Sequence, residues 1–449
     1  MSTKTFPNQS QSPITNTIII ITYFFIRIGL EIKLNSNPSS LFHSIINRPE
    51  IVTPITGWKE LQEGVYLFKN GYDPYQGDIF HQSPLLLYLF SIVSNPISIS
   101  LVYAFIDCCS AYLSLSLFRF KSTDLGSGAS SSWKDHGWVL DLVRNVRDWQ
   151  FLICYLCFPL QLFTSLSKST IVFTNLFILI SLKASLKNQL ALSMFSLSIA
   201  THLSVYPILL LPSTISIICE KKHGLNSTWS TQSTTIFQSI SIYVSHFGTL
   251  IWLFPFRISK SVFLSHLNVN QNLNPNLGLH WYFSIEIFDH FRLFFNLVFQ
   301  LHLLIYLIPF LIKFKNERVF GFVLMNGIVS IFKSYPSIGD VTFANTLFLL
   351  TYPELISHLR HPILTITFYI YSLSLLPTFY YQWIHLGSGN VNFYYASTLV
   401  WSVSNGFFWI DNLSSLLKLQ FQKDLKRLKE LDGIRDWVLD EEVEAIVQS

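Results

Sequence analysis

Residues 14–34 read Ile14-Thr-Asn-Thr-Ile-Ile-Ile-Ile-Thr-Tyr-Phe-Phe-Ile-Arg-Ile-Gly-Leu-Glu-Ile-Lys-Leu34. As a helix, a run of this length crosses the roughly 30 Å hydrocarbon core of a bilayer. It has no small-residue cleavage site and carries Arg27 within it. We therefore interpret it as a signal anchor that stays in the mature protein.

The composition extends this interpretation to the whole chain. Of its 449 residues, 50% are hydrophobic and 12% are charged, and that charged share is about half the usual one for a soluble protein. The mean hydropathy is +0.40. A surface with so few charges does not stay in water, so the sequence predicts an all-α polytopic membrane protein. This excludes a secreted disulfide scaffold, a nucleic-acid binder and a soluble Rossmann-type enzyme.

The cysteines and the net charge of +4 indicate neither a cofactor nor a specific partner. Five cysteines in so long a chain do not form a disulfide framework. Cys154 and Cys157 have the spacing of a redox or metal pair, but their surroundings are wholly apolar. We expect them to be small residues in a packed helix, and the sequence predicts no cofactor and no metal site.

The apolar runs predict about 12 transmembrane segments. Several are too short for a full crossing, so we expect some re-entrant, broken or interfacial helices. Asn95-Pro96 is expected to divide the longest run. The predicted segments are 14–34, 84–119, 149–163, 169–183, 189–203, 205–219, 235–256, 281–312, 319–333, 339–357, 363–385 and 393–417.

The distribution of basic residues predicts the orientation. With 12 segments, most basic connections fall on the same side as the N-terminus, which is the cytosolic side in membrane proteins. Both termini are then cytosolic, with residues 1–13 leading into a multi-pass domain over 14–417. Loops 35–83 and 257–280 become luminal. The tail 418–449 is amphipathic and is expected to be a cytosolic helix at the membrane surface.

Three polar stretches with Pro and Gly interrupt apolar runs at predicted luminal ends: 71–84, 274–290 and 332–340. Pro and Gly end helices and leave backbone groups free, which membrane depth tolerates only beside protein or a polar cavity. Ionisable side chains there usually face a cavity or a partner. His290 follows Glu286 by four residues, which predicts one shared helix face. The alternative for the aromatic residues is a simple interfacial belt.

The stretches carry a family resemblance that runs from about residue 48 to 417. The chain resembles the PIG-U subunit of the glycosylphosphatidylinositol (GPI) transamidase. The most specific match is Phe332-Lys-Ser-Tyr-Pro-Ser-Ile-Gly-Asp-Val341. The other matching blocks are Glu50-Ile-Val-Thr-Pro54 with Trp58 and Glu63-Gly64; Pro74-Tyr75 with Phe80-His81 and Pro84-Leu85; Asn276-Leu-Gly-Leu-His-Trp-Tyr-Phe283 with Glu286, Phe288 and His290-Phe291; and Gly387-Ser-Gly-Asn390 with Asn392-Phe-Tyr-Tyr395.

The resemblance implies a non-catalytic, multi-pass subunit of the endoplasmic reticulum membrane. In that family another, cysteine-protease-like subunit performs the transamidation, so the implied partners are the other transamidase subunits and the GPI lipid. It also implies a fold similar to the GT-C glycosyltransferases. The alternative function is therefore an ER mannosyltransferase of the GT-C type that uses a dolichyl-phosphate sugar.

One sequence feature separates these two functions. GT-C mannosyltransferases place an acidic motif, often Asp-x-Asp, in the first luminal loop as metal contact or base. Residues 35–70 contain no Asp, and Asp73 and Asp78 are five residues apart. The sequence therefore predicts no catalytic residues and favours the binding subunit.

A GPI-binding site needs an apolar groove, a cation or amide donor near the phosphate, and aromatic or acidic groups along the glycan. The luminal stretches supply such groups. The predicted lipid-binding residues are Asn276, His280, Trp281, Tyr282, Glu286, His290, Lys333, Ser334, Tyr335, Asp340 and Asn390.

Overall fold

The computed structural model describes residues 13–36, 47–76, 79–126, 146–224, 229–253 and 274–432. This part of the chain is helical throughout and contains no strand. It divides into two compact units, which are considered separately. Unit 1 comprises Met1–Lys121 and Val146–Thr351, and unit 2 comprises Ser122–Asn145 and Tyr352–Ser449.

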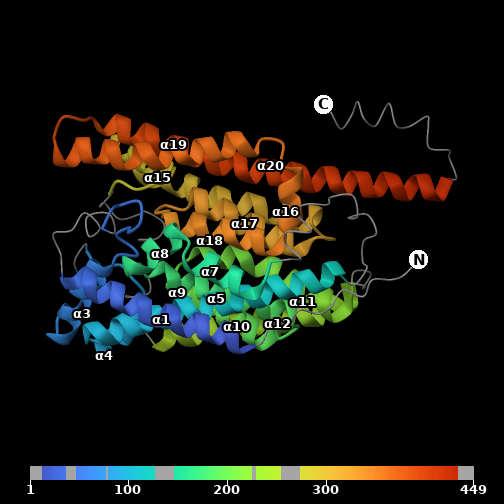
Figure 1. Ribbon diagram of the computed structural model, residues 1–449, viewed down its shortest axis with the longest axis horizontal. Coiled ribbons are helices and arrows are strands. Elements are labelled where there is room, and N and C mark those ends of the chain that lie inside the picture. Colours follow the sequence, from blue (N-terminus) through green and yellow to red (C-terminus); the bar gives the residue numbers. More distant parts are fainter. Residues whose placement is uncertain are drawn as a thin grey trace. The chain divides into compact units, whose positions relative to one another are not determined.

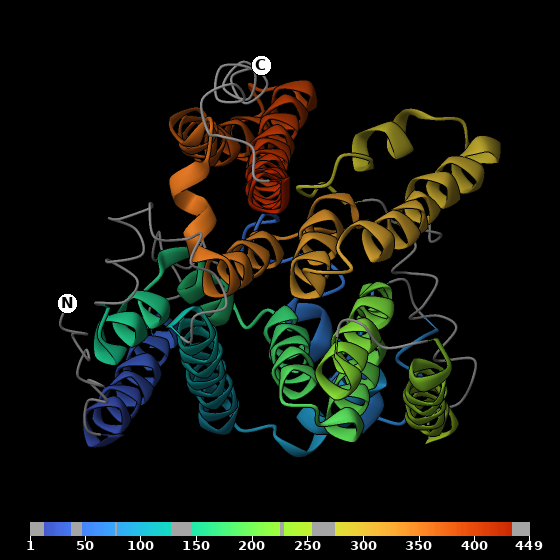
Figure 2. The same ribbon diagram turned by 90° about the vertical axis from the view of Figure 1, so that its right-hand side faces the viewer.

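Unit 1 holds most of the helices (Figure 1), and many of them are seen nearly end-on in Figure 2 because they run roughly side by side. Their bounds are α1 Pro13–Ser36, α3 Trp58–Lys69, α4 Pro84–Ile92, α5 Pro96–Gly126, α7 Asp148–Leu156, α8 Pro159–Leu166, α9 Ile171–Leu186, α10 Leu190–Leu203, η2 Tyr206–Leu210, α11 Leu211–His223, α12 Trp229–Leu253, α14 Trp281–Glu286, α15 Asp289–Leu301, η3 His302–Tyr306, α16 Leu307–Lys313, α17 Arg318–Phe332 and α18 Ile338–Thr351.

Unit 2 is built around a hairpin of two long helices. It contains η4 Pro353–His358, α19 Pro362–Tyr380, the π-helical turn η5 Tyr381–His385, and α20 Val391–Asp432. The carboxylate of Asp411 on α20 accepts hydrogen bonds from the backbone N–H groups of Arg360 and His361, both at 2.8 Å. These donors have no partner inside α19, so Asp411 caps that helix from its neighbour.

Asn95 and Pro96 set the start of α5, as the sequence predicts. Helix α4 ends at Ile92 and α5 begins at Pro96, so the longest apolar run is divided at Asn95-Pro96. The Oδ1 atom of Asn95 accepts from the N–H of Ile97 at 3.1 Å. Proline suits the first turn of a helix, where its missing N–H has no intrahelical partner in any case.

A hydrophobic cluster in unit 1 joins α9 to α3, α4 and α5, and the extensively buried helices of this unit include α9, α10, α17 and α18. Helix α17 buries residues on all sides, including Phe320, Phe322 and Met325, and α18 buries Phe348 completely. Helices that are apolar all round lie inside a bundle. These four are shorter apolar helices of 10–17 residues.

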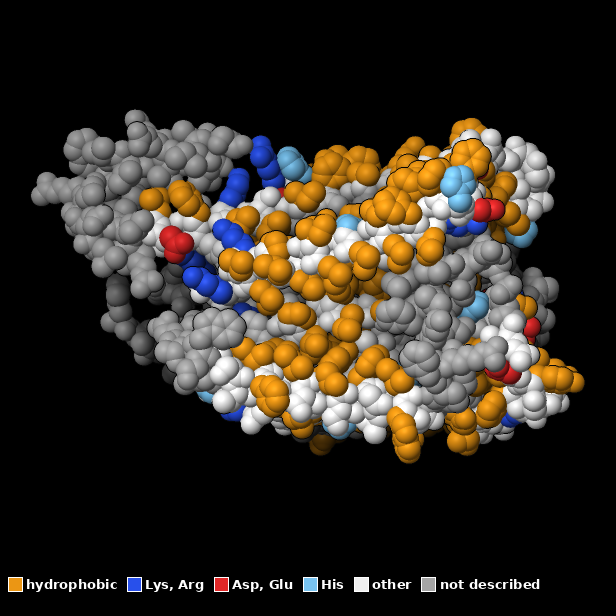
Figure 3. Space-filling view, turned by 180° about the vertical axis from the view of Figure 1, so that it is seen from behind, with side chains coloured by type: hydrophobic (Ala, Val, Ile, Leu, Met, Phe, Trp, Pro, Cys, Tyr) orange, Lys and Arg blue, Asp and Glu red, His pale blue; other side chains and the backbone are white. Residues whose placement is uncertain are grey.

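The peripheral helix α15 has the reverse polarity of a helix in a soluble protein. Its polar residues Asn296 and Gln300 are buried, whereas Phe294, Val298 and Leu301 are exposed. Hydrophobic side chains also cover much of the face in Figure 3. An outward apolar face with polar groups inside is what hydrocarbon as solvent favours.

By length and composition, four described helices could cross a membrane. They are Pro96–Phe120, Gln232–Leu253, Asp289–Lys313 and Pro362–His385. The pair α7 and α8, bent by 54°, could form a fifth, which fits the expected broken helices. The predicted count of about 12 stays a prediction. The predicted tail boundary at residue 418 falls inside α20, which continues without a break to Asp432.

The expectation for the cysteine pair is wrong. Cys154 lies on α7 and Cys157 directly follows it as the C-cap, but both side chains are exposed rather than packed. The reason is that α7 turns only part of its apolar surface inward, burying Leu152 and Leu156. Both cysteines have free thiols.

Candidate functional site

The turn between α17 and α18 is organised by an ion pair. The Nζ atom of Lys333 lies 2.5 Å from Oδ1 of Asp340, and Lys333 is only 6% exposed. The other carboxylate oxygen of Asp340 accepts from the backbone N–H of Ser337 at 2.9 Å and from its hydroxyl at 2.7 Å. The carboxylate therefore caps the first turn of α18 while it neutralises the buried ammonium group.

The segment that precedes α14 packs against this turn. A Cβ atom on Gly278 would lie 3.1 Å from Cδ of Pro336 and 3.3 Å from the carbonyl oxygen of Ser334. The absence of a side chain thus permits close contact. Tyr335 also hydrogen-bonds to the backbone of Asn274. The structure therefore brings together the two stretches that the sequence singled out, 274–290 and 332–340.

Tyr206 of η2 is a central residue that the sequence analysis missed. Its hydroxyl donates to Oε1 of Gln300 at 2.7 Å and accepts from the backbone N–H of Ser334 at 2.9 Å. It thereby links η2, α15 and the turn after α17. No motif or charged residue near Tyr206 in the sequence indicated its role. Its partners Gln300 and Ser334 are 94 and 128 residues away.

The predicted site residues of unit 1 divide into a buried scaffold and an exposed rim. Within unit 1, Tyr282 is half-buried, and Glu286 and His290 are exposed. Asn390 is exposed in unit 2, where its Oδ1 accepts from the N–H of Asn392 at 3.1 Å. The scaffold consists of the half-buried His280 and Asp340 and of the buried Asn276, Trp281, Lys333, Ser334 and Tyr335.

The predicted shared helix face of Glu286 and His290 is wrong. Helix α14 ends at Glu286, Ile287 is extended (ψ 148°), and α15 begins at Asp289. The new helix gains an acidic residue in its first turn, which its dipole favours. Spacing by four predicts one face only within an uninterrupted helix.

Arg292 adds a cation to the rim, and the sequence analysis did not identify it. It donates from Nε to the carbonyl oxygen of Ser284 at 2.9 Å, and its Nη2 lies 2.6 Å from Oδ1 of Asp289. Because that carbonyl belongs to the last turn of α14, the arginine joins the two short helices. The rim thus carries two exposed carboxylates, of Glu286 and Asp289, beside one guanidinium group.

His280 is held between aromatic rings. Its ring stacks on Phe299 with 4.1 Å between centroids, and Phe332 lies farther out at 6.5 Å. Its buried Nε2 atom has no hydrogen-bond partner among the described residues. Burial, with a smaller contribution from His302, lowers the pKa of His280 to about 4. The ring is therefore neutral at pH 7 and acts as part of the scaffold.

Two adjacent cavities border Lys333 and Tyr206. The space open to the centres of water molecules is about 20 Å³ in one and 30 Å³ in the other. Volumes of this size hold one or two waters, not a sugar ring. Their linings include the hydroxyl groups of Thr174 and Ser204.

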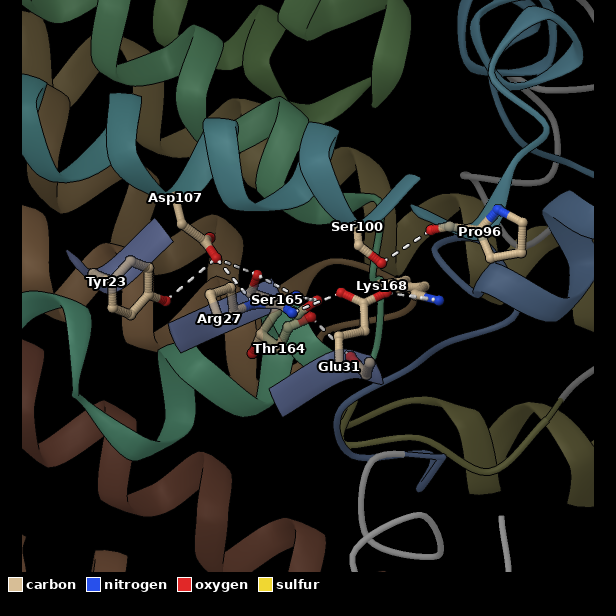
Figure 4. Close-up of polar contacts among 10 residues, drawn as sticks. Tyr23, Arg27, Glu31, Pro96, Ser100, Asp107, Thr164, Ser165 and Lys168 are labelled. Atoms are coloured by element: carbon tan, nitrogen blue, oxygen red, sulfur yellow. Dashed lines mark hydrogen bonds and ion pairs between the residues drawn. The ribbon is translucent and has the colours of Figure 1, made fainter. Parts of the chain in front are cut away.

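A second polar cluster ties α1 into unit 1 (Figure 4). Arg27 donates to Glu31 at 2.7 Å and to the carbonyl oxygen of Ser165 at 2.8 Å, and its Nε lies 3.5 Å from Oδ2 of Asp107. Lys168 contacts the other oxygen of Glu31 at 2.8 Å. Two cations face two anions, so the buried charges balance.

This cluster stabilises the backbone at Lys168. The hydroxyl of Tyr103 donates to the carbonyl oxygen of Lys168 at 2.6 Å, at a residue with φ 57°. A non-glycine residue adopts that backbone conformation only where its surroundings hold it. Arg27 and Asp107 within apolar runs were the available sequence signals, but their pairing required the tertiary structure.

The chain is similar in sequence to a known protein family. Residues 22–401 match the family described as GPI transamidase subunit PIG-U. The chain belongs to the PIG-U family. It is 31% identical over 404 residues to the GPI transamidase component GAB1 of Saccharomyces cerevisiae, covering 90% of this chain and 95% of the yeast protein.

Two further relatives agree with this PIG-U assignment. The human GPI-anchor transamidase component PIGU is 31% identical over 402 residues, covering 85% of this chain and 90% of the human protein. The GAB1 homolog of Schizosaccharomyces pombe is 28% identical over 384 residues, covering 83% of this chain and 88% of the yeast protein. The recognition made from the stretches with Pro and Gly is thereby confirmed.

The described part of this PIG-U chain offers no ready metal site. No group of three or more His, Cys, Asp or Glu side chains converges there. Of the two aspartates considered for a transferase, Asp73 accepts from the N–H of Tyr75 at 3.0 Å, within its own turn. Asp78 lies outside the described residues.

Proposed function

We propose that this chain is a non-catalytic subunit of a GPI transamidase in the endoplasmic reticulum membrane, and that it helps to bind or present the GPI lipid. The proposal is supported by relatives that are named as GPI transamidase components. The sequence similarity covers 95% and 90% of the length of these relatives. Its partners would be the other subunits, among them a cysteine-protease-like catalytic one.

The proposed topology is a GT-C-like bundle of about 12 segments with both termini cytosolic. The described helices that pass as full spans number four or five. The shorter apolar helices α9, α10, α17 and α18 would supply further segments, as would α1. Short helices are compatible with a membrane where other protein covers their ends.

One observation supports a lipid site most directly: a charged rim adjoins a long apolar helix face. Glu286, Asp289 and Arg292 lie at the start of α15. From Phe291 to Ile312, every exposed residue of α15, η3 and α16 is apolar. A headgroup site at the end of an apolar face matches the form of a membrane lipid.

The chemistry of the rim suits a zwitterionic headgroup. The exposed carboxylate of Glu286 would attract an amine of the glycan, and the guanidinium of Arg292 would face a phosphate. Acyl chains would lie along the outward side chains that follow, such as Phe294 and Val298. The buried Lys333–Asp340 pair would hold the adjacent turn and would not touch lipid.

The mannosyltransferase alternative receives no comparable support. The first predicted luminal loop lacks the acidic pair over 35–70.

Lipid profiling of cells depleted of this protein tests the proposal. A transamidase defect leaves GPI assembly complete, so mature GPI and uncleaved precursor proteins should both accumulate. A block at an under-mannosylated intermediate, without complete GPI, would instead establish the mannosyltransferase function. Re-expression of the intact chain should clear both accumulated species and serves as the control.

A further inference from the structure

Helix α12 has an outward face that differs from the other exposed helix faces. Its segment Gln232–Leu253 is long and apolar enough to cross a membrane, yet only 3 of its 22 residues are buried inside the protein. The inner face is well packed, with Thr235, Ser239 and Tyr243 buried at successive helical turns. The Tyr243 hydroxyl donates to Oγ1 of Thr201 on α10 at 2.9 Å.

The outward face carries hydrogen-bonding groups that the described protein leaves unmatched. Gln238, Ser241 and Ser245 are all exposed, and their spacings of three and four place them along one side of the helix. Their side chains make no hydrogen bond within the part of the chain that the structure describes. In hydrocarbon, each unmatched polar group is unfavourable by several kcal/mol.

Two other candidate spans show what lipid-facing helices of this protein look like. The exposed residues between Phe291 and Ile312 are all apolar. On α19, the exposed Thr367 and Ser374 hydroxyls donate to carbonyl oxygens four residues earlier, both at 2.8 Å. These two hydroxyls on α19 are thus satisfied within the helix, whereas the amide of Gln238 is too long to be matched in this way.

We propose that a transmembrane helix of another protein chain packs against α12 on the side of Gln238, Ser241 and Ser245. The small serines admit close approach of a second backbone, as at many helix contacts in membranes. The Gln238 amide requires a carbonyl, hydroxyl or amide group opposite it. The partner is therefore a helix with small residues at the crossing and at least one hydrogen-bonding group.

Site-specific photocrosslinking in the full-length protein tests this in membranes. A benzophenone amino acid at Ser241 should crosslink to another protein of defined mass. The same group at Val298, on the apolar face of α15, should yield lipid adducts and serves as the matched control. Lipid adducts alone at position 241, or a crosslink within the same chain, would refute the interface.

Substitutions on this face of α12 then test whether the crosslinked protein binds there. The double variant Ser241→Leu, Ser245→Leu should reduce recovery of that protein in mild detergent about tenfold, at an unchanged level of this chain. Ile370→Leu, at an exposed residue of α19, should leave recovery unchanged. If the double variant recovers as much of the crosslinked protein as the wild type does, the proposal is overturned. These readouts do not involve GPI, so they stand apart from the test of the proposed function.

Discussion

Lys333 and Asp340 form an ion pair of 2.5 Å inside the turn that joins α17 to α18. The pair is largely withdrawn from solvent, with side-chain exposures of 7% and 11%. Because Asp340 also accepts two hydrogen bonds from Ser337, it cannot leave the lysine without disrupting the start of α18. The pair thus determines the shape of the turn to which the 274–280 segment packs.

Removal of the lysine alone should therefore destabilise the protein. Lys333→Met leaves the Asp340 carboxylate without its cation, and breaking such a buried pair costs about 3–5 kcal/mol. We expect a lower thermal unfolding temperature in detergent and a lower cellular level. Lys313→Met, at an exposed lysine, is the control, and equal stability of the two variants would contradict the role of the pair.

Unlike Lys333→Met, Glu286→Ala should impair function and leave stability nearly unchanged. Its side chain is exposed, so the stability should change by less than about 0.5 kcal/mol. Loss of the carboxylate should nevertheless impair GPI attachment to a reporter protein, if the rim binds an amine of the lipid. Glu63→Ala removes another exposed carboxylate and should leave attachment normal. Normal attachment with Glu286→Ala would exclude this residue from the site.

Acidification should weaken the protein through His280. Burial lowers its pKa from the ordinary value of about 6.5 to about 4, so the unfolded chain binds a proton in this range and the folded chain does not. Stability therefore falls as pH decreases from about 6.5 towards 4, by at most ~3 kcal/mol. His280→Phe keeps the aromatic stack and should reduce the difference between unfolding temperatures at pH 7 and pH 5. An unchanged difference would show that other groups cause it.

Glycosylation tests the predicted orientation. The sequons begin at Asn8, Asn226 and Asn412, and we expect none to carry glycan. Asn412 is fully buried and donates to the carbonyl oxygen of Phe408 at 2.7 Å, while the first two are predicted to be cytosolic. A sequon introduced near Asn270 should be modified. A shift of the unaltered protein on glycosidase treatment would overturn the orientation.

Local patterns in the sequence were enough to predict the helical class and many helix ends. The division at Asn95-Pro96 followed from the chemistry of proline, which acts within one turn. The matching sequence blocks likewise identified the family, because such turns are specified by short runs of residues. The break after Glu286 was not predicted, since no proline or glycine marks it.

The sequence by itself determined that this is an apolar helical chain with charged and polar residues at defined places along it. Only the tertiary structure decided which of those residues meet. Arg27 pairs with Asp107 across 80 residues, and Tyr206 reaches Ser334 across 128. Periodicity reports neighbours within a helix, whereas contacts between helices depend on packing of the whole unit. For the same reason, the pairing of Lys333 with Asp340 inside the protein became visible only in the tertiary structure.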